Sequence, residues 1–308
     1  MKILLAIDGS EPSITAVSVA KTLTLPAGST IELLTVISDD PWTYGPWPVP
    51  AIALAPRDLE RVRREVQARL DGIATDLAAE GRIIRTMVRQ GRAATEIVGE
   101  ADRFGADLIL LGARGHGAVD RILVGSVSSE VVDEADCPVL VVRTPGLGRV
   151  LVATDGSADG DLATRFVGPS GIFGKAAIKV LSVVDAGMPW WTGMSPVDGM
   201  VAADAYAGVV DAAERHAKRV ASSTAETIGL DRVETEAASR GGEVGSTIVE
   251  KATAWHADVV AVGTRGHGVL HRALVGSTSR QVLHEAPMSV LVVRPKRALV
   301  TRARTGVA

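Results

Sequence analysis

The chain has 308 residues, 46% of them hydrophobic and only 3% aromatic, which suits two ordinary domains with cores of Val, Leu, Ile and Ala. A net charge of −3 lacks the basic excess of a general nucleic-acid binder. The single cysteine, Cys137, rules out an intrachain disulfide, and no apolar run approaches the roughly 18 residues of a membrane span. We therefore expect a cytoplasmic protein without nucleic-acid or membrane partners, and Cys137 as a small core residue.

In the first half of the chain, apolar runs alternate with segments of helical periodicity. The expected strands are residues 3–7, 31–37, 83–88, 108–111 and 138–142, and the expected helices are 10–24, 59–79, 94–104 and 126–134. Ser10 is expected to cap the first helix, and the Pro-rich stretch 40–56 is expected to be a loop. This alternation is typical of a parallel sheet wound by helices on both faces.

The second half of the chain repeats the first. KILLAIDGS at 2–10 returns as RVLVATDGS at 149–157, and RQGRAATEIV at 89–98 returns as RGGEVGSTIV at 240–249. The offset between the copies rises from 147 at the Asp-Gly-Ser turns to 151 later, so the second copy carries four extra residues. A period of domain length indicates duplication. We predict an α/β fold with two tandem Rossmann-like doubly wound domains, each with a five-stranded parallel sheet and four helices. The expected divisions are domains 1–144 and 148–295 and a basic tail, 296–308.

Each copy contains the same glycine-rich stretch after its fourth strand. GARGHGAVDRILVGS at 112–126 and GTRGHGVLHRALVGS at 263–277 share the spacing Gly, two residues, Gly, nine residues, Gly-Ser. Twelve of 21 positions agree between 112–132 and 263–283. Gly112, Gly115 and Gly117 can take positive φ and leave backbone N–H groups facing outward, beside the unpaired donors of the next helix. The stretch is interpreted as a phosphate cradle; the alternative is a tight turn before a helix.

The stretch differs from two familiar phosphate-binding motifs. It does not match GxxxxGK[ST], and the first strand does not lead into GxGxxG, which disfavours a dinucleotide cofactor. In doubly wound sheets, ligands bind at the carboxyl ends of the strands where the winding reverses. If the first and fourth strands are neighbours, the Asp8 turn and Gly112 line one crevice.

This combination resembles the universal stress protein family, in its tandem form that binds ATP in both domains. The resemblance rests on G-x2-G-x9-G-S after a fourth strand and Asp-Gly-Ser after a first strand, and it covers essentially the whole chain. It implies one ATP site in each domain, with Mg²⁺ accompanying the nucleotide. The candidate nucleotide-binding residues are Asp8, Gly9, Ser10, Val36, Gly112, Arg114, Gly115, His116, Gly117, Gly125, Ser126, Val127 and Ser128 in the first half, and Asp155, Gly156, Ser157, Val183, Gly263, Arg265, Gly266, His267, Gly268, Gly276, Ser277, Thr278 and Ser279 in the second.

Several of these residues have a plainer alternative role. Asp8 and Asp155 match the acidic residue that the family places near the ribose, but they can also simply end strands and cap helices. Arg114 and Arg265 either pair with phosphate or point into solvent. His116 lies in the motif, as does its counterpart in the second copy, but a general base needs a positioned partner and none is evident. No catalytic residue is therefore assigned.

The leading hypothesis is a stress-response or regulatory protein that binds ATP in each domain and signals through the bound state rather than through fast turnover. The alternative is a slow Mg²⁺-dependent ATPase or nucleotidyl-transfer enzyme, with Asp8 and Asp155 holding the ion. A third idea is that the second half has become structural. No metal site formed by the protein alone is expected.

The resemblance also suggests pairing through the last strands, 139–142 and 290–293. These apolar runs would otherwise form an exposed sheet edge. We expect the halves to pair internally as a pseudo-dimer, with a homodimer as a further state and with signalling partner proteins of unknown identity.

Overall fold

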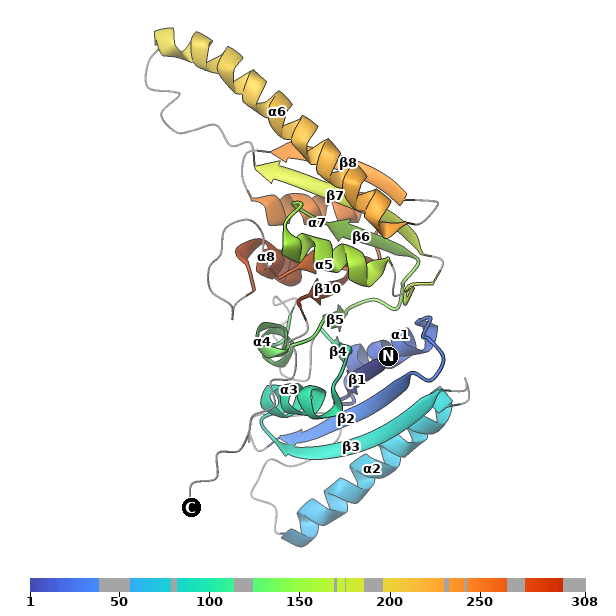
Figure 1. The fold of residues 1–308 in the computed structure, drawn as a ribbon. Helices are drawn as coiled ribbons and strands as arrows, with labels where there is room; N and C mark the ends of the chain where they lie inside the picture. Colours follow the sequence, from blue (N-terminus) through green and yellow to red (C-terminus); the bar gives the residue numbers. More distant parts are fainter. Residues whose placement is uncertain are drawn as a thin grey trace, which may run out of the picture.

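The computed structural model describes residues 1–38, 56–78, 82–113, 124–168, 171–174, 176–185, 196–229, 233–240, 243–264 and 275–295. The first half contains β1 (Lys2–Ala6), α1 (Glu11–Thr22), β2 (Thr30–Ser38), α2 (Pro56–Ala78), β3 (Ile83–Gly91), α3 (Ala93–Phe104), β4 (Leu108–Gly112), α4 (Ser126–Glu134) and β5 (Val139–Val142). The second half contains β6 (Arg149–Ala153), α5 (Ala158–Val167), β7 (Ala177–Asp185), α6 (Pro196–Ile228), β8 (Val233–Arg240), α7 (Val244–Ala254), β9 (Val259–Gly263), α8 (Ser277–Glu285) and β10 (Ser289–Val293). In this described part, each half alternates five strands with four helices, as predicted (Figure 1).

The strands form one continuous sheet that runs through both halves, in the order β3-β2-β1-β4-β5-β10-β9-β6-β7-β8 (Figure 1). Within each half, neighbouring strands are parallel. β1 lies between β2 and β4, and β6 lies between β7 and β9, so the winding reverses at the first strand of each domain. The prediction that the first and fourth strands are neighbours is therefore confirmed.

The two halves meet at β5 and β10, which pair antiparallel. Leu291 lies opposite Leu140, and Val290 lies opposite Val141. Beside this junction, Arg280 of α8 forms an ion pair with Asp133 of α4 at 2.8 Å. The expected internal pairing through the last strands is thus confirmed, and it covers two apolar edges that would otherwise be open to aggregation.

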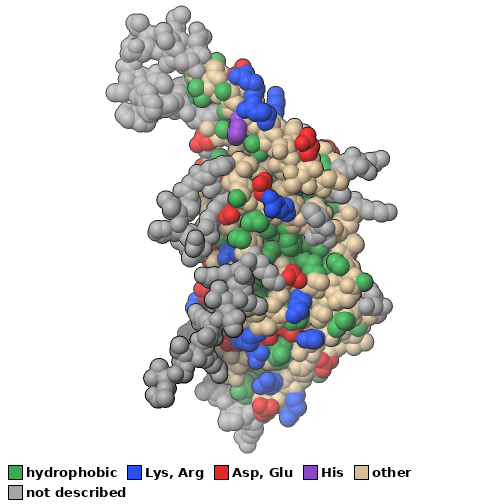
Figure 2. All heavy atoms as spheres, in the orientation of Figure 1, with side chains coloured by type: hydrophobic (Ala, Val, Ile, Leu, Met, Phe, Trp, Pro, Cys, Tyr) green, Lys and Arg blue, Asp and Glu red, His purple; other side chains and the backbone are tan. Residues whose placement is uncertain are grey.

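Helices cover both faces of the sheet. One apolar layer contains buried side chains of α1, α2, α5 and α6, and the other contains those of α3, α4, α7 and α8. Successive strand residues alternate between the layers, as in Leu4 and Leu5 of β1. Figure 2 shows apolar side chains gathered near the middle of one face, between the two halves. Cys137 is buried, as expected of a core residue. No helix among the described residues is both long and apolar enough to cross a membrane.

The sheet register corrects two details. β3 continues to Gly91, beyond the predicted end at residue 88, because all nine of its residues pair with β2. Ser38 pairs with Gly91, whereas its counterpart Asp185 pairs with Arg240, an offset of 149 residues between the halves. The helices that follow begin at an offset of 151. The sequence match of residues 89–98 with 240–249 therefore differs by two positions from the structural equivalence within the strand. Residues 40–55 of the predicted loop 40–56 and the tail 296–308 lie outside the described residues, but the loop prediction was wrong at Pro56, which begins α2.

One pair of core positions carries opposite charges in the two halves. Glu32 of β2 and Glu100 of α3 are buried, and the Nε atom of Arg89 donates to Glu100 at 2.7 Å. The equivalent positions in β7 and α7 hold Lys179 and Lys251. Both lysines form ion pairs with one carboxylate of β8, that of Glu236, at 3.2 and 2.8 Å. The two domains therefore share a backbone plan but stabilise this position by opposite means.

Candidate functional site

The first wall of the candidate site is the turn between β1 and α1. Asp8 Oδ1 accepts hydrogen bonds from the N–H and Oγ of Ser10, at 2.9 and 2.5 Å. Gly9 has φ of 81°, a left-handed conformation that glycine takes without strain. Ser10 caps α1 by accepting from the N–H of Ser13 at 3.3 Å, as predicted. Asp8 therefore holds the turn, and its contact with a nucleotide stays a prediction.

The second half repeats this turn with one addition. Asp155 Oδ1 accepts from the N–H of Ser157 at 3.0 Å, and Ser157 caps α5 through the N–H of Gly160. Gly156 has φ of 76°. Thr154 takes the place of Ile7, and its Oγ1 accepts from the Gly156 N–H at 3.1 Å. Both turns are thus fixed by their own side chains before any ligand arrives.

The first glycine of each glycine-rich stretch ends a strand and lies against a helix start. A Cβ atom at Gly112 would lie 2.6 Å from the carbonyl carbon of Pro12 and 2.7 Å from the nitrogen of Ser13. A Cβ atom at Gly263 would lie 2.3 Å from the carbonyl oxygen of Asp159. Neither glycine has positive φ, so Gly112 does not use the conformational freedom that the sequence allows it. These positions require glycine because the backbones of the strand and the helix approach too closely for a side chain.

Backbone hydrogen bonds fix the two ends of the stretch between β4 and α4. The N–H of Ala113 donates to the Val142 oxygen at 2.8 Å, and the N–H of Gly125 donates to the Ala113 oxygen at 2.7 Å. In the second half, the N–H of Gly276 donates to the Thr264 oxygen at 2.6 Å. The residues between these anchors, 114–123 and 265–274, lie outside the described structure. They include the predicted Arg114, Gly115, His116 and Gly117, and Arg265, Gly266, His267 and Gly268.

The helices after these stretches, α4 and α8, begin without a side-chain cap. Their N-cap residues are Gly125 and Gly276, and neither helix has an acidic residue in its first turn. By contrast, α1 and α5 are capped by serines and carry acidic residues in the first turn. The positive dipole ends of α4 and α8, beside the exposed Ser126 and Ser277, therefore carry no acidic group of their own helix, a feature that is compatible with an anion.

The serines two residues further along play a different part. Ser128 is buried and donates its Oγ to the Gly112 oxygen at 2.8 Å, and Ser279 donates to the Gly263 oxygen at 2.6 Å. Each bond ties a helix start to the strand end beneath it. Val127 and Thr278 lie half-buried beside these serines. We therefore assign Ser128 and Ser279 the task of positioning the helix, and any ligand contact by them stays a prediction.

The carboxyl end of β2 lies next to the segment that follows β1. The N–H of Ile7 donates to the Leu34 oxygen at 2.8 Å, so the backbone groups of Leu34 face β1. Backbone groups of a strand alternate between its two neighbours, so those of Val36 also point to this side, past the end of β1 at Ala6. In the second half, the N–H of Thr154 donates to the Leu181 oxygen at 3.0 Å, which gives Val183 the same placement. The predicted adenine-bordering backbone therefore faces the point where the winding reverses.

The sequence did not indicate that the first turns of α1 and α5 belong to the site. Pro12 and Asp159 lie about a hundred positions from the glycines that they touch, and only the sheet topology brings them together. Thr264 Oγ1 donates to Asp159 Oδ2 at 3.2 Å, whereas the first half has Ala113 and Pro12 at these positions. The two sites are therefore similar in backbone and different in side chains.

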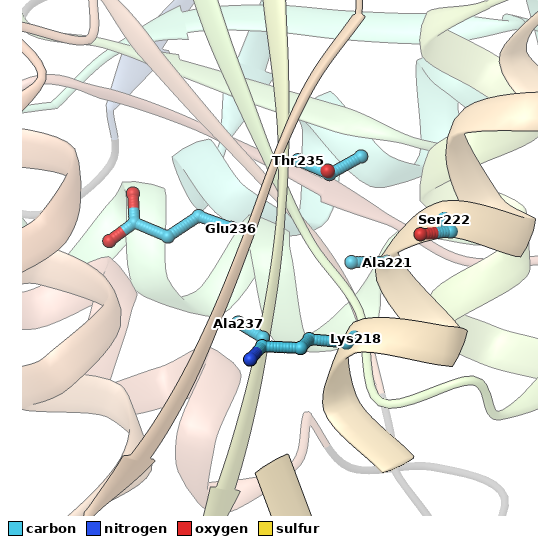
Figure 3. A pocket seen from close by; sticks show the side chains of 6 residues that line it. All are labelled: Lys218, Ala221, Ser222, Thr235, Glu236 and Ala237. Carbon is cyan, nitrogen blue, oxygen red and sulfur yellow. The ribbon is translucent and has the colours of Figure 1, made fainter. Parts of the chain in front are cut away.

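A separate cavity of about 340 Å³ lies between α6 and the edge strand β8 (Figure 3). Its lining includes Lys218 and Ser222 of α6 and Thr235 of β8, while the Glu236 side chain points to the other side of the strand. The cavity does not lie at the carboxyl ends of β6 and β9, so we do not associate it with the candidate site. Among the described residues, no group of three or more His, Cys, Asp or Glu side chains is placed to hold a metal ion.

Comparison with known proteins gives matches in both halves of the chain. The model of the universal stress protein family matches residues 1–143 and, separately, 146–294. A universal stress protein of Mycolicibacterium smegmatis is 25% identical over 315 residues, which cover 96% of this chain and 97% of that protein. One from Mycobacterium tuberculosis is 31% identical over 196 residues, 61% of this chain, and the match spans only 62% of that protein's length.

The fold has a similar solved counterpart. The crystal structure of a universal stress protein from Archaeoglobus fulgidus matches with a TM-score of 0.65 and 22% identity, covering 96% of this chain and 98% of that one. This likeness extends over both halves of the chain.

Proposed function

Since the chain belongs to the universal stress protein family and carries two of its domains in tandem, we propose that it is a regulatory protein of the stress response that binds one ATP in each domain. The observation that carries the proposal is the pair of helix N-termini, α4 and α8, which have no side-chain cap and no first-turn acid. Such helix ends favour phosphate groups. The bound state, rather than fast hydrolysis, would carry the signal.

The residues around the crevice suit different parts of ATP. The first-turn N–H groups of α4 and the Ser126 hydroxyl would bind phosphates, and the backbone of Val36 would border the adenine. Asp8 would lie near the ribose, with Mg²⁺ accompanying the phosphates. The close approach of α1 to Gly112 supports this assignment because it places the end of β4 directly beside the turn that contains Asp8.

The alternative, slow Mg²⁺-dependent hydrolysis or nucleotidyl transfer, would depend on Asp8 and Asp155. In the structure, each carboxylate accepts hydrogen bonds from the serine two residues later, a turn-holding role that needs no catalysis. Steady ADP or AMP release that disappears in the Asp8→Asn and Asp155→Asn variants would favour the enzymatic alternative.

Ser126→Asp is expected to weaken ATP binding at the first site at least about tenfold, because a carboxylate would face the phosphates. Asp at the start of a helix is itself favourable, by about 0.3–1 kcal/mol, so the fold should not suffer. Ser277→Asp should do the same at the second site. Isothermal titration calorimetry should show two ATP per wild-type chain and one for each aspartate variant.

The matched controls are Ser126→Asn and Ser277→Asn, which have nearly the same shape as the aspartate variants but no charge. Both controls should keep two sites. No binding by the wild type at millimolar ATP, or aspartate variants that bind as well as the asparagine controls, would contradict the proposal.

A further inference from the structure

Two arginines extend from one domain to a helix of the other. Arg143 follows directly after β5, and its Nη2 donates to the Leu283 oxygen in the last turn of α8 at 2.5 Å. Arg294 follows directly after β10 and donates to the oxygens of Val132 and Asp133 in the last turn of α4. The two arginines occupy equivalent positions in the halves. The contacts are therefore reciprocal across the β5–β10 junction.

These bonds satisfy groups that a helix cannot satisfy by itself. The last carbonyl groups of a helix have no partner within it, and a cation there complements the negative end of the dipole. α4 has no basic residue in its own last turn. The cation at the end of α4 is therefore supplied by Arg294 of the other domain.

The backbone of each arginine lies next to the strand end that carries its own domain's candidate site. The N–H of Ala113 donates to the oxygen of Val142, the residue before Arg143. The N–H of Thr264 donates to the oxygen of Val293, the residue before Arg294. Each arginine thus joins the strand end of one site to the helix whose N-terminus faces the other site.

We propose that Arg143 and Arg294 are positioning residues for the nucleotide site of the opposite domain, which couples the two sites. Arg143 holds α8, and Arg294 holds α4. Each of these helices has only nine residues, a length that is marginal without tertiary contacts, so release of the carboxyl end loosens the first-turn N–H groups at the other end. The inference rests on the proposed binding of ATP. It adds that each domain supports the nucleotide site of the other domain.

The test uses the full chain with one site blocked. In the Ser126→Asp background the second site has the higher affinity, and Arg143→Met should weaken ATP binding there about fivefold or more, whereas Arg294→Met should not. In the Ser277→Asp background the effects should exchange. Methionine keeps the apolar stem but removes the charge and the donors. Arg143→Lys, which restores a cation, should recover part of the affinity.

A second measurement does not depend on the nucleotide. Amide hydrogen exchange of the ligand-free chain should be faster in α8 of Arg143→Met and unchanged in α4, with the reverse for Arg294→Met. Affinity losses confined to the arginine's own domain, or equal at both sites, would overturn the proposal, as would unchanged exchange in the opposite helix. If exchange becomes faster in the opposite helix but the chain binds no ATP, the proposed nucleotide function and the coupling of the sites are both rejected. Only the contact between arginine and helix then remains.

Discussion

Gly263→Ala is expected to lower the free energy of unfolding by about 2–3 kcal/mol. The new Cβ atom would lie 2.3 Å from the carbonyl oxygen of Asp159, and this neighbour is backbone at the start of α5, which cannot rotate away as a side chain can. Relief requires α5 to move from β9, and overpacking of this kind costs roughly 1–3 kcal/mol. Gly112→Ala should act in the same way on α1 and β4. Urea unfolding followed by circular dichroism measures the loss.

Two other glycines provide the matched control. Gly72 in α2 and Gly208 in α6 have nothing within 4 Å of an added Cβ atom. Alanine in an exposed helix interior is favoured over glycine by about 0.5–1 kcal/mol, so both control variants should gain stability. A Gly263→Ala chain as stable as the wild type would contradict the close approach of strand and helix.

Glu32→Gln is expected to raise the free energy of unfolding at about pH 8 by about 1–3 kcal/mol and to change it little at about pH 4. Burial, and then the charge of Glu100, raises the pKa of Glu32 above its ordinary value of 4.5, and Arg85 and Arg89 offset this only in part. No donor among the described residues reaches Glu32 Oε1.

The sign follows from the proton balance. A raised pKa means that the folded chain binds more protons than the unfolded chain between 4.5 and the folded-state value. Stability is therefore lost as the pH rises through that window, and glutamine, which does not titrate, removes the loss. Urea unfolding at several pH values measures the difference between variant and wild type.

Glu236→Gln in the other domain should respond in the opposite way. Burial by itself would raise the pKa of Glu236, but the hydrogen bonds and charges of Lys251 and Lys179 outweigh it and lower that pKa. The stability that Glu236 contributes is present above its unfolded-state pKa and is lost as the pH falls through the folded-state value. Its glutamine variant should therefore be less stable than the wild type at about pH 8 and nearly equal to it in acid. A Glu32→Gln variant that is also destabilised at about pH 8 would contradict the argument.

The fold could be predicted from the sequence because its signals are local. Apolar runs and helical periodicity mark the alternating elements, and the repeat shows two domains. The Asp-Gly-Ser turns at Asp8 and Asp155 locate the first strand ends. The register of β8 could not be predicted. The sequence repeat aligns its last residues with the first half at an offset of 151, whereas its pairing with β7 corresponds to an offset of 149.

The candidate site could be predicted in outline but not in its physical causes. In the sequence, Gly112 is equally compatible with a positive φ and with a close approach of two backbones. Only the contact with Pro12 in the structure distinguishes these two explanations. From the sequence, Arg143 is interpreted as the start of a linker. No neighbouring residue in the sequence indicates the carbonyl group of α8 to which it donates a hydrogen bond. The charge of Glu32 likewise gives no sign that its neighbour in the fold is Glu100.

The antiparallel junction of β5 and β10 has a further consequence because both strands belong to one polypeptide. Two identical subunits that meet across a two-fold axis must make every contact twice. Here, Arg280 pairs with Asp133, while the equivalent positions hold Ser129 and His284. Covalent linkage also keeps the partner at a high effective concentration, so the interface does not depend on protein abundance. Fusion thus permits one-sided contacts, and with them two binding sites that can differ within a single molecule.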